Sequence, residues 1–318
     1  MGAAILRSMC CGLMLATAVQ AQEPARPKEP GPEMVTVPAG AFVRGDSSGE
    51  PDERPQRRIE LPAFRLDRTE VTRGAYASCV QKGACRPPAA PGRAPDPRDL
   101  LPPELPVAYV SWHDAAAYCA FAGKRLPSEA EWEKAARGTD GRRYPWGGDF
   151  ACRRGNFGNF AGDGRCADEG APGKLLPVGS FPQGVSPYGA LDMAGNVWEW
   201  VWDPYSADAY RRPPLHPPAG KSGPKLVFPD APRPAAKAAA NGPGSPVSGT
   251  GEPGDRRVLH GGGCCSIFGL PRSADRLALP ASYRDADIGF RCAQDLPPPD
   301  RAAAAPKNAP HGPSQPQN

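Results

Sequence analysis

The sequence lacks an apolar segment long enough to cross a membrane. The candidate run, from Met9 to Val19, is shorter than the about 20 residues that a membrane-spanning helix requires. The sequence also lacks the basic stripe interleaved with aromatic residues that is typical of nucleic-acid-binding proteins, because its net charge of +4 comes from scattered Arg and Lys residues. We therefore expect a protein that neither spans a membrane nor binds nucleic acid.

Zinc and iron ligands are also scarce. There is no Cys-x-x-Cys motif with a nearby histidine, which disfavours a zinc site. The four histidines are too scattered in sequence to predict an iron triad, and they are His113, His216, His260 and His311.

The N-terminus has the pattern of a secretory signal peptide. Arg7 precedes the short apolar run, and small residues precede a predicted cleavage after Ala21. A lipid anchor on Cys10 or Cys11 is the alternative, but both cysteines precede most of the apolar run. The sequence thus predicts a signal peptide over residues 1–21 and an exported mature protein, periplasmic or secreted.

Cysteine usage fits an oxidising compartment. Ten cysteines are present, and cleavage would leave eight, an even number that favours disulfides. Two pairs have short spacings that suggest local loops, namely Cys79 with Cys85 and Cys152 with Cys166. The other cysteines are Cys119, Cys264, Cys265 and Cys292.

Proline and glycine mark the domain boundaries. The 43 prolines and 37 glycines gather in tracts that leave about two hundred residues to build one core. We expect, in chain order, the signal peptide, a linker at 22–33, one domain at 34–295 with a Pro/Ala-rich insertion at 211–256, and a disordered tail at 296–318.

Within the domain, periodicity and capping residues predict short strands and few helices. Alternation predicts a hairpin over 34–45, a strand over 57–67 interrupted at Pro62, a strand from Pro106, and strands over 257–263 and 288–293. Helices are predicted to begin after the cap residues Thr72, Ser111 and Ser128, the last two with capping boxes completed by Asp114 and Glu131. The fold class is therefore α+β with irregular connections.

The stretch GALDMAGNVWEWVW over 189–202 concentrates the chemistry of the chain. It holds three of the six tryptophans, which indicates a packed centre. Asp192 and Glu199 supply hard oxygen ligands, and the glycine between them lets backbone carbonyls turn the same way. A calcium-holding turn and a tight turn capped by its acids are equally consistent with this spacing. The Asn- and Gly-rich loop after residue 148 is likewise either held by disulfides and calcium or simply irregular.

Five blocks of sequence resemble the formylglycine-generating enzyme family, also called sulfatase-modifying factors. The blocks are MVTVPAGAFVRGD, SWHDAAAYCAFAGKRLPSEAEWEKAARG, YPWGG, PVGSF with GALDMAGNVWEW, and RVLHGGG with IGFRCA. The resemblance covers residues 34–295. It implies an atypical C-type-lectin-like fold with little regular secondary structure, stabilised by calcium.

The resemblance also implies particular metal ligands and one long-range disulfide. The family motif N-x-x-G-N-x-W-E, here with Asp in place of its first Asn, binds one calcium. The resemblance implies that its ligands here are Asp192, the backbones of Gly195 and Val197, and Glu199. For a second calcium, the resemblance implies the ligands Asn156, Phe157 and Asp168. The family disulfide between a helix and the GFRC segment matches Cys119 and Cys292.

The reaction of the family is the oxidation by dioxygen of a cysteine in a client sulfatase, with copper held by two cysteines of an R-G-G-S-x-x-C-x-x-x-x-C segment. In register with the double glycine of HGGGCCSIFGLP, Gly263 stands at the serine position, and Ser266 and Pro271 stand at the two cysteine positions. A soft cuprous ion needs thiolates, so we expect no copper site of this kind. Cys264 and Cys265 are adjacent and point to opposite faces on extended backbone, which favours a vicinal disulfide or two separate thiols.

Two functions remain open. The first is a calcium-stabilised binding or scaffold module that presents a groove, with Trp198, Trp112 and Arg291 as lining, to a protein, peptide or glycan. The second is an oxidoreductase of the formylglycine-generating type that oxidises a protein cysteine with dioxygen and uses Cys264 or Cys265 as an unconventional redox pair.

Overall fold

The computed structural model describes residues 33–90, 92, 100, 102–158, 166, 174–217, 255–264 and 271–296. The predicted signal peptide and most of the predicted linker, insertion and tail lie outside these residues, as do Asp168, Cys265 and Ser266. Three short α-helices stand out in this part of the chain: α1 (Arg73–Gln81), α2 (Trp112–Phe121) and α3 (Glu129–Arg137). Single 3-10 turns occur at η1 (Pro51–Glu53), η3 (Cys152–Arg154), η4 (Pro182–Gly184) and η5 (Ala209–Arg211).

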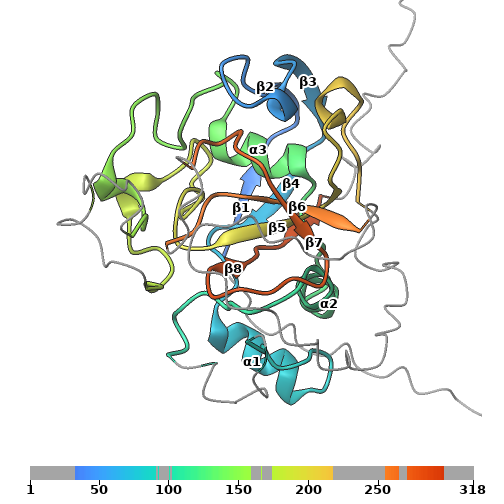
Figure 1. Ribbon diagram of the computed structural model, residues 1–318, viewed down its shortest axis with the longest axis vertical. Coiled ribbons are helices and arrows are strands. Elements are labelled where there is room, and N and C mark those ends of the chain that lie inside the picture. Colours follow the sequence, from blue (N-terminus) through green and yellow to red (C-terminus); the bar gives the residue numbers. More distant parts are fainter. Residues whose placement is uncertain are drawn as a thin grey trace, which may run out of the picture.

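In the described residues the strands form three small sheets (Figure 1). The four-stranded sheet has the order β7 (Leu277–Pro280), β6 (Arg256–His260), β5 (Trp198–Pro204) and β8 (Ile288–Gly289). A three-stranded sheet joins β1 (Met34–Val37), β4 (Phe64–Asp67) and β9 (Ala293–Asp295), and a two-stranded sheet joins β2 (Gly40–Arg44) and β3 (Arg57–Leu61). All pairings are antiparallel except that of β5 with β8. The α+β class is therefore confirmed.

The helices begin where the capping residues predict. Thr72 Oγ1 accepts a hydrogen bond from Ala75 N at 3.2 Å. Ser111 and Ser128 both form complete capping boxes, with Asp114 and Glu131. These side chains satisfy backbone N–H groups that a helix start leaves unpaired, so the predicted starts of all three helices are confirmed.

Three of the strand predictions are wrong in their pairing or extent. The alternating segment 34–45 is not a hairpin, because β1 pairs with β4 while β2 pairs with β3. The break at Pro62 carries the chain from one sheet to the other, so each half finds a partner in a different sheet. No strand starts at Pro106, which makes only an isolated bridge to Thr72. Residues 288–293 divide between β8 and β9.

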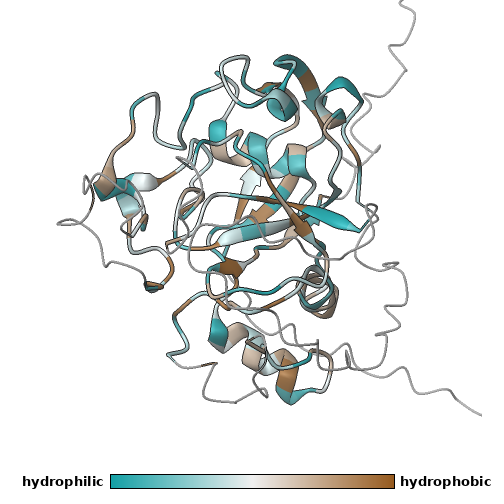
Figure 2. Ribbon diagram, viewed as in Figure 1, coloured by the Kyte–Doolittle hydropathy of each residue, from teal (hydrophilic) through white to brown (hydrophobic). Residues whose placement is uncertain are grey.

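The core has two neighbouring hydrophobic clusters with β5 at their junction. Trp200 belongs to one cluster and Val201, which follows it on the strand, belongs to the other. Trp200 Nε1 donates to Val110 O at 3.0 Å, and Trp112 Nε1 donates to Val201 O at 2.8 Å. Figure 2 shows brown hydrophobic stretches where strands cross the middle of the molecule and much teal in the outer ribbon. The stretch that the sequence singles out is therefore part of the core.

Disulfides join segments that the fold brings together. The three predicted pairs are all present: Cys79–Cys85, Cys119–Cys292 and Cys152–Cys166. The second pair links α2 to the segment before β9 across 173 residues of sequence. Within the described ranges, no helix combines the length and the apolar character needed to cross a bilayer.

Candidate functional site

The turn that leads into β5 is shaped by left-handed backbone. Asp192, Gly195 and Asn196 have φ angles of 56°, 91° and 67°. Non-glycine residues rarely adopt such angles, and Asp and Asn tolerate them best because their short side chains hydrogen-bond locally. A Cβ atom at Gly195 would lie 2.6 Å from Asn156 O, so this position requires glycine. Gly195 and Asn196 therefore determine the path of the backbone between Asp192 and Glu199.

An acidic cluster, formed by Glu70, Asp192 and Glu199, lies buried around this turn. Glu199 is completely buried and makes a two-point ion pair with Arg291, from Nε to Oε2 and from Nη2 to Oε1, both at 2.7 Å. Trp132 Nε1 also donates to Glu199 Oε2 at 2.8 Å. Glu199 is therefore well partnered, whereas the other two acids are not paired with Arg291.

Glu70 is the member of the acidic cluster that the sequence did not reveal. It is completely buried, and its Oε1 accepts from Asn196 Nδ2 at 3.1 Å while its Oε2 has no hydrogen-bond partner. Burial, and then the charges of Asp192 and Glu199, raise the pKa of Glu70 well above its usual range. Glu70 lies between β4 and α1, 126 residues before Asn196, and no local motif announces it.

The positions of the second predicted calcium lie beside the first. Asn156 is buried, and its Nδ2 donates to Lys174 O and to Asn196 Oδ1, both at 3.0 Å. Its Oδ1 has no partner, and the neighbouring Phe157 is buried as well. Asn196 therefore connects Glu70 to Asn156 through its side-chain amide. Asp168, the third predicted ligand, lies outside the described residues.

In the described part of the chain no three His, Cys, Asp or Glu side chains are arranged around a common metal position, but single oxygens at this turn have the chemistry that a hard divalent cation such as calcium binds. Two buried oxygens, Glu70 Oε2 and Asn156 Oδ1, lack donors in the structure. The acidic cluster carries more negative charge than Arg291 balances. Unpartnered buried oxygens and uncompensated buried carboxylates are costly unless a cation or proton meets them. Carboxylate, amide and backbone oxygens are the ligands that calcium prefers.

The glycine segment after β6 departs from the family's copper-binding pattern at two described positions, Gly263 and Pro271. Pro271 stands at the second cysteine position, is buried, and packs so closely on Gly262 that a Cβ there would lie 2.5 Å from Pro271 Cβ. At Gly263, the serine position, a Cβ would lie 2.2 Å from Asp287 Oδ2. Cys264 is buried and disulfide-bonded, so it is not a separate free thiol.

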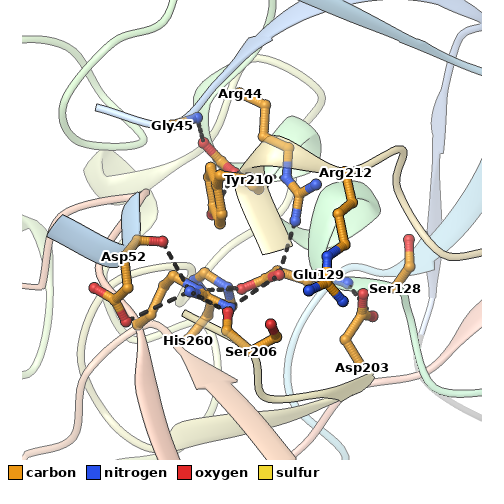
Figure 3. A network of polar contacts seen from close by, with 12 residues as sticks. Arg44, Gly45, Asp52, Ser128, Glu129, Asp203, Ser206, Tyr210, Arg212 and His260 are labelled. Atoms are coloured by element: carbon orange, nitrogen blue, oxygen red, sulfur yellow. Dashed lines mark hydrogen bonds and ion pairs between the residues drawn. The ribbon is translucent and has the colours of Figure 1, made fainter. Parts of the chain in front are cut away.

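A buried polar network supports this segment from below (Figure 3). His260, the residue before the glycines, stacks on Trp132 with ring centres 4.8 Å apart, and its Nε2 lies 3.4 Å from Glu129 Oε1. Glu129 also pairs with Arg276 at 2.5 Å and with Arg44 at 2.8 Å. Burial opposes ionisation, but Arg276, His260 and Arg44 outweigh it and lower the pKa of Glu129. His260, Glu129 and Arg44 in this network are 0%, 0% and 1% exposed, so these three side chains are closed to a substrate.

The groove expected from the sequence is wrong as to its residues. Trp198, Trp112 and Arg291 are 2%, 4% and 0% exposed, so they are core residues and cannot line an open surface. Their contacts with buried partners place them inside, and those contacts cannot be predicted from the sequence. An open pocket of about 520 Å³ lies elsewhere, beside the network, and its lining is Glu50, Pro51, Asp52, Tyr205, Ala207, Asp208 and Arg211.

Comparison with known proteins identifies the family. Residues 19–296 match the sulfatase-modifying factor enzyme 1-like domain. The chain is 32% identical over 344 residues to the formylglycine-generating enzyme of Streptomyces coelicolor, covering 87% of this chain and 96% of that protein. It is 31% identical over 298 residues to serine/threonine-protein kinase Pkn1 of Chlamydia trachomatis, covering 86% of this chain but only 40% of that longer protein.

Solved structures agree with this assignment. The structure of PvdO from Pseudomonas aeruginosa matches with a TM-score of 0.58 and 28% identity, covering 83% of this chain and 95% of that one. The shared architecture is the C-type-lectin-like fold that the resemblance implies. The chain therefore belongs to the family of sulfatase-modifying factor enzyme 1-like domains.

Proposed function

We propose that this protein is an exported binding or scaffold module of its family, stabilised by calcium and without the family's copper-dependent oxidation of cysteine. The observation that carries this proposal is Pro271. It stands where the second copper-binding cysteine is expected, offers no side-chain donor, and is buried against Gly262. A hydroxyl at the first position, Ser266, is a poor ligand for a soft cuprous ion.

Calcium would bind at the acidic cluster and beside Asn156. Bound there, it would supply the positive charge that the buried carboxylates and the bare amide oxygen otherwise lack. The chain's own contribution is the left-handed turn through Asp192 and Asn196, which orients these oxygens before any ion arrives. The turn leads directly into β5, which lies at the junction of the two hydrophobic clusters. A calcium ion that fixes the turn would therefore also fix the start of this central strand.

The open pocket offers a ligand face for the module. Asp52 and Tyr205 form its inner wall, where Tyr205 Oη donates to Asp52 Oδ2 at 3.0 Å. Asp52 also receives Arg276 of the buried network, which anchors the pocket to the core. Carboxylates beside a tyrosine ring suit the amide, hydroxyl and basic groups of a peptide or glycan.

The decisive experiment is an oxidation assay on a cysteine-containing sulfatase-motif peptide. The purified mature protein, supplied with Cu(I) and dioxygen, is expected to leave the mass of the peptide unchanged, while the Streptomyces coelicolor relative, assayed as the positive control, is expected to convert it. Copper-dependent oxidation that disappears in Cys264→Ser or Cys265→Ser would instead establish the oxidoreductase alternative.

A further inference from the structure

The open pocket beside the buried network is built from two segments that are far apart in the sequence. One wall comes from η1 and the residue before it, and the other comes from the end of the β5 segment and η5. Its volume of about 520 Å³ lies within the range of about 300–1,000 Å³ that is usual for ligand sites. The pocket can therefore hold one long side chain of a ligand.

Arg276 joins the two walls from beneath. Its side chain is 0% exposed, and its Nη1 donates to Asp52 O at 2.8 Å and to Ser206 O at 3.3 Å. The same nitrogen lies 3.4 Å from Asp52 Oδ2, and Figure 3 shows Asp52 at the edge of the network. Glu129 Oε1 holds Arg276 Nε at 2.5 Å. One buried guanidinium thus fixes both walls, so the pocket is formed before any ligand enters it.

The lining of the pocket is rich in hydrogen-bond acceptors. Ionised carboxylates only accept, and three of them line the pocket, whereas Arg211 is the one charged donor among the lining residues. Tyr205 Oη already donates its hydrogen to Asp52 Oδ2 at 3.0 Å. Arg211 Nε is 3.8 Å from Asp208 Oδ1, and both side chains are mostly exposed, so this pair is weak. A ligand must therefore bring the donors.

Two of the carboxylates have oxygens to offer. Glu50 is exposed, and no cation pairs with it in the part of the chain that the structure describes. Oδ2 of Asp52 is occupied by Tyr205 and Arg276, but no donor from the described residues reaches Oδ1. The side chain of Asp52 is 21% exposed, so it is held in place and still accessible. An acceptor that is oriented in advance binds a ligand at a lower entropic cost.

We propose that this pocket binds a positively charged side chain of a peptide ligand, with Asp52 and Glu50 as the contacting carboxylates and with Arg276 and Tyr205 as residues that position Asp52. The proposal rests on the proposed function of a binding module. A guanidinium has five N–H donors and no acceptor, so it matches an acceptor-rich lining. Hydroxyl groups of a neutral glycan would also bring acceptors, for which Arg211 is the one charged donor.

Nuclear magnetic resonance titration of the isotope-labelled mature protein tests the proposal. The probes are a capped Gly-Arg-Gly peptide and its citrulline analogue, which keeps the shape of the side chain and loses the charge. The arginine peptide is expected to shift the backbone amides of Asp52 and Ala207. Its affinity should exceed that of the citrulline peptide by about fivefold or more, the effect of a charged hydrogen bond in an open pocket.

Three variants give the test its direction. Asp52→Asn should weaken binding of the arginine peptide by about fivefold or more. Arg211→Gln should strengthen it by about twofold, because it removes a like charge from the rim. A change that only disturbed the packing would not produce effects of opposite sign. Asp149→Asn is the matched control, since Asp149 is exposed and loses the same charge but does not line the pocket, and it should leave the affinity unchanged.

The outcomes separate this proposal from the one on which it rests. Equal affinity for the arginine and citrulline peptides, or shifts confined to residues away from the pocket, would overturn the proposal. So would maltotriose that shifts the pocket amides while the arginine peptide does not. If Asp52→Asn does not fold, Glu50→Gln replaces it, because Glu50 is exposed, and unchanged affinity in that variant would count against the proposal. The binding-module proposal itself fails only in the oxidation assay, which does not involve this pocket.

Discussion

Gly263 has no room for the serine that the family motif places there. A Cβ at this position would lie 2.2, 2.8 and 3.0 Å from Oδ2, Cγ and Cβ of Asp287, whose side chain is 6% exposed. Gly263→Ser is therefore expected to lower the free energy of unfolding by about 1–3 kcal/mol, a usual cost of overpacking. Urea denaturation measures this cost. Asp287→Ala in the same chain should recover part of it, and an equal loss in the presence and absence of Asp287 would argue against the clash.

Asp203 gives the buried network a defined dependence on pH. It accepts a hydrogen bond from Glu129 N at 2.8 Å, and burial, followed by the charge of Glu129, raises its pKa from 3.8 to about 7. Because the folded pKa exceeds the unfolded one, the stabilisation from its proton is complete below about pH 4 and is lost as the pH rises to about 7.

Asp203→Asn should remove this loss, because an amide keeps the acceptor and has no charge to bury. The melting temperature of the variant relative to the wild type is therefore expected to rise as the pH increases from about 4 to about 8. Thermal melts across this range measure the difference. A constant difference would show that Asp203 does not titrate in the network.

At the scale of single residues, the sequence predicts what a local pattern announces. Asp192 and Glu199 stand in a recognisable turn, and the structure places both in the acidic cluster. Glu70 belongs to the same cluster, but it reaches it through the segment between β4 and α1, where Arg68 O accepts from Leu191 N at 2.7 Å and Glu70 Oε1 accepts from Asn196 Nδ2. The groove residues failed for the same reason, because exposure is a property of the assembled core and not of Trp112 or Arg291.

At the scale of elements, helices were predictable and strand partners were not. A capping box is a contact between residues three apart, so the starts of α2 and α3 could be read directly from Ser111 and Ser128. A strand needs a partner from elsewhere in the chain, and alternation alone does not name it. The segment that contains β1 and β2 alternates like a hairpin, yet the two strands join different sheets (Figure 1).

Helix α3 shows how one element connects the candidate sites. All of its residues are buried, and it packs against β2, β5 and β6. Trp132 on this helix donates to Glu199 of the acidic cluster on one side and stacks on His260 of the network on the other. Glu129, one residue after its cap, binds Arg44 and Arg276. The helix is therefore the rigid bridge between the proposed calcium site and the glycine segment.

At the scale of the whole molecule, short elements need cross-links to hold one arrangement. The Cys119–Cys292 disulfide closes 173 residues of chain, and in the chain-entropy model such a closure stabilises the fold by about 5 kcal/mol. It ties α2 to the segment that carries Arg291, and so to the acidic cluster. The disulfide and the proposed calcium thus act on the same junction between sheets.

Calcium removal is expected to lower the melting temperature of the mature protein by several degrees. An ion that binds only the folded state stabilises it by RT ln(1 + [Ca²⁺]/Kd), about 2.7 kcal/mol at one hundred times Kd. For a domain of this size, each kcal/mol shifts the melting temperature by about 2–4 °C. Calorimetric melts with calcium, with excess chelator, and with chelator followed by calcium measure the effect and its reversal. Magnesium is the matched control, because its smaller, strictly octahedral shell suits a flexible carboxylate and carbonyl site poorly. A melting curve that chelator leaves unchanged would contradict the calcium site, and the buried carboxyl group of Glu70 would then have to carry a proton.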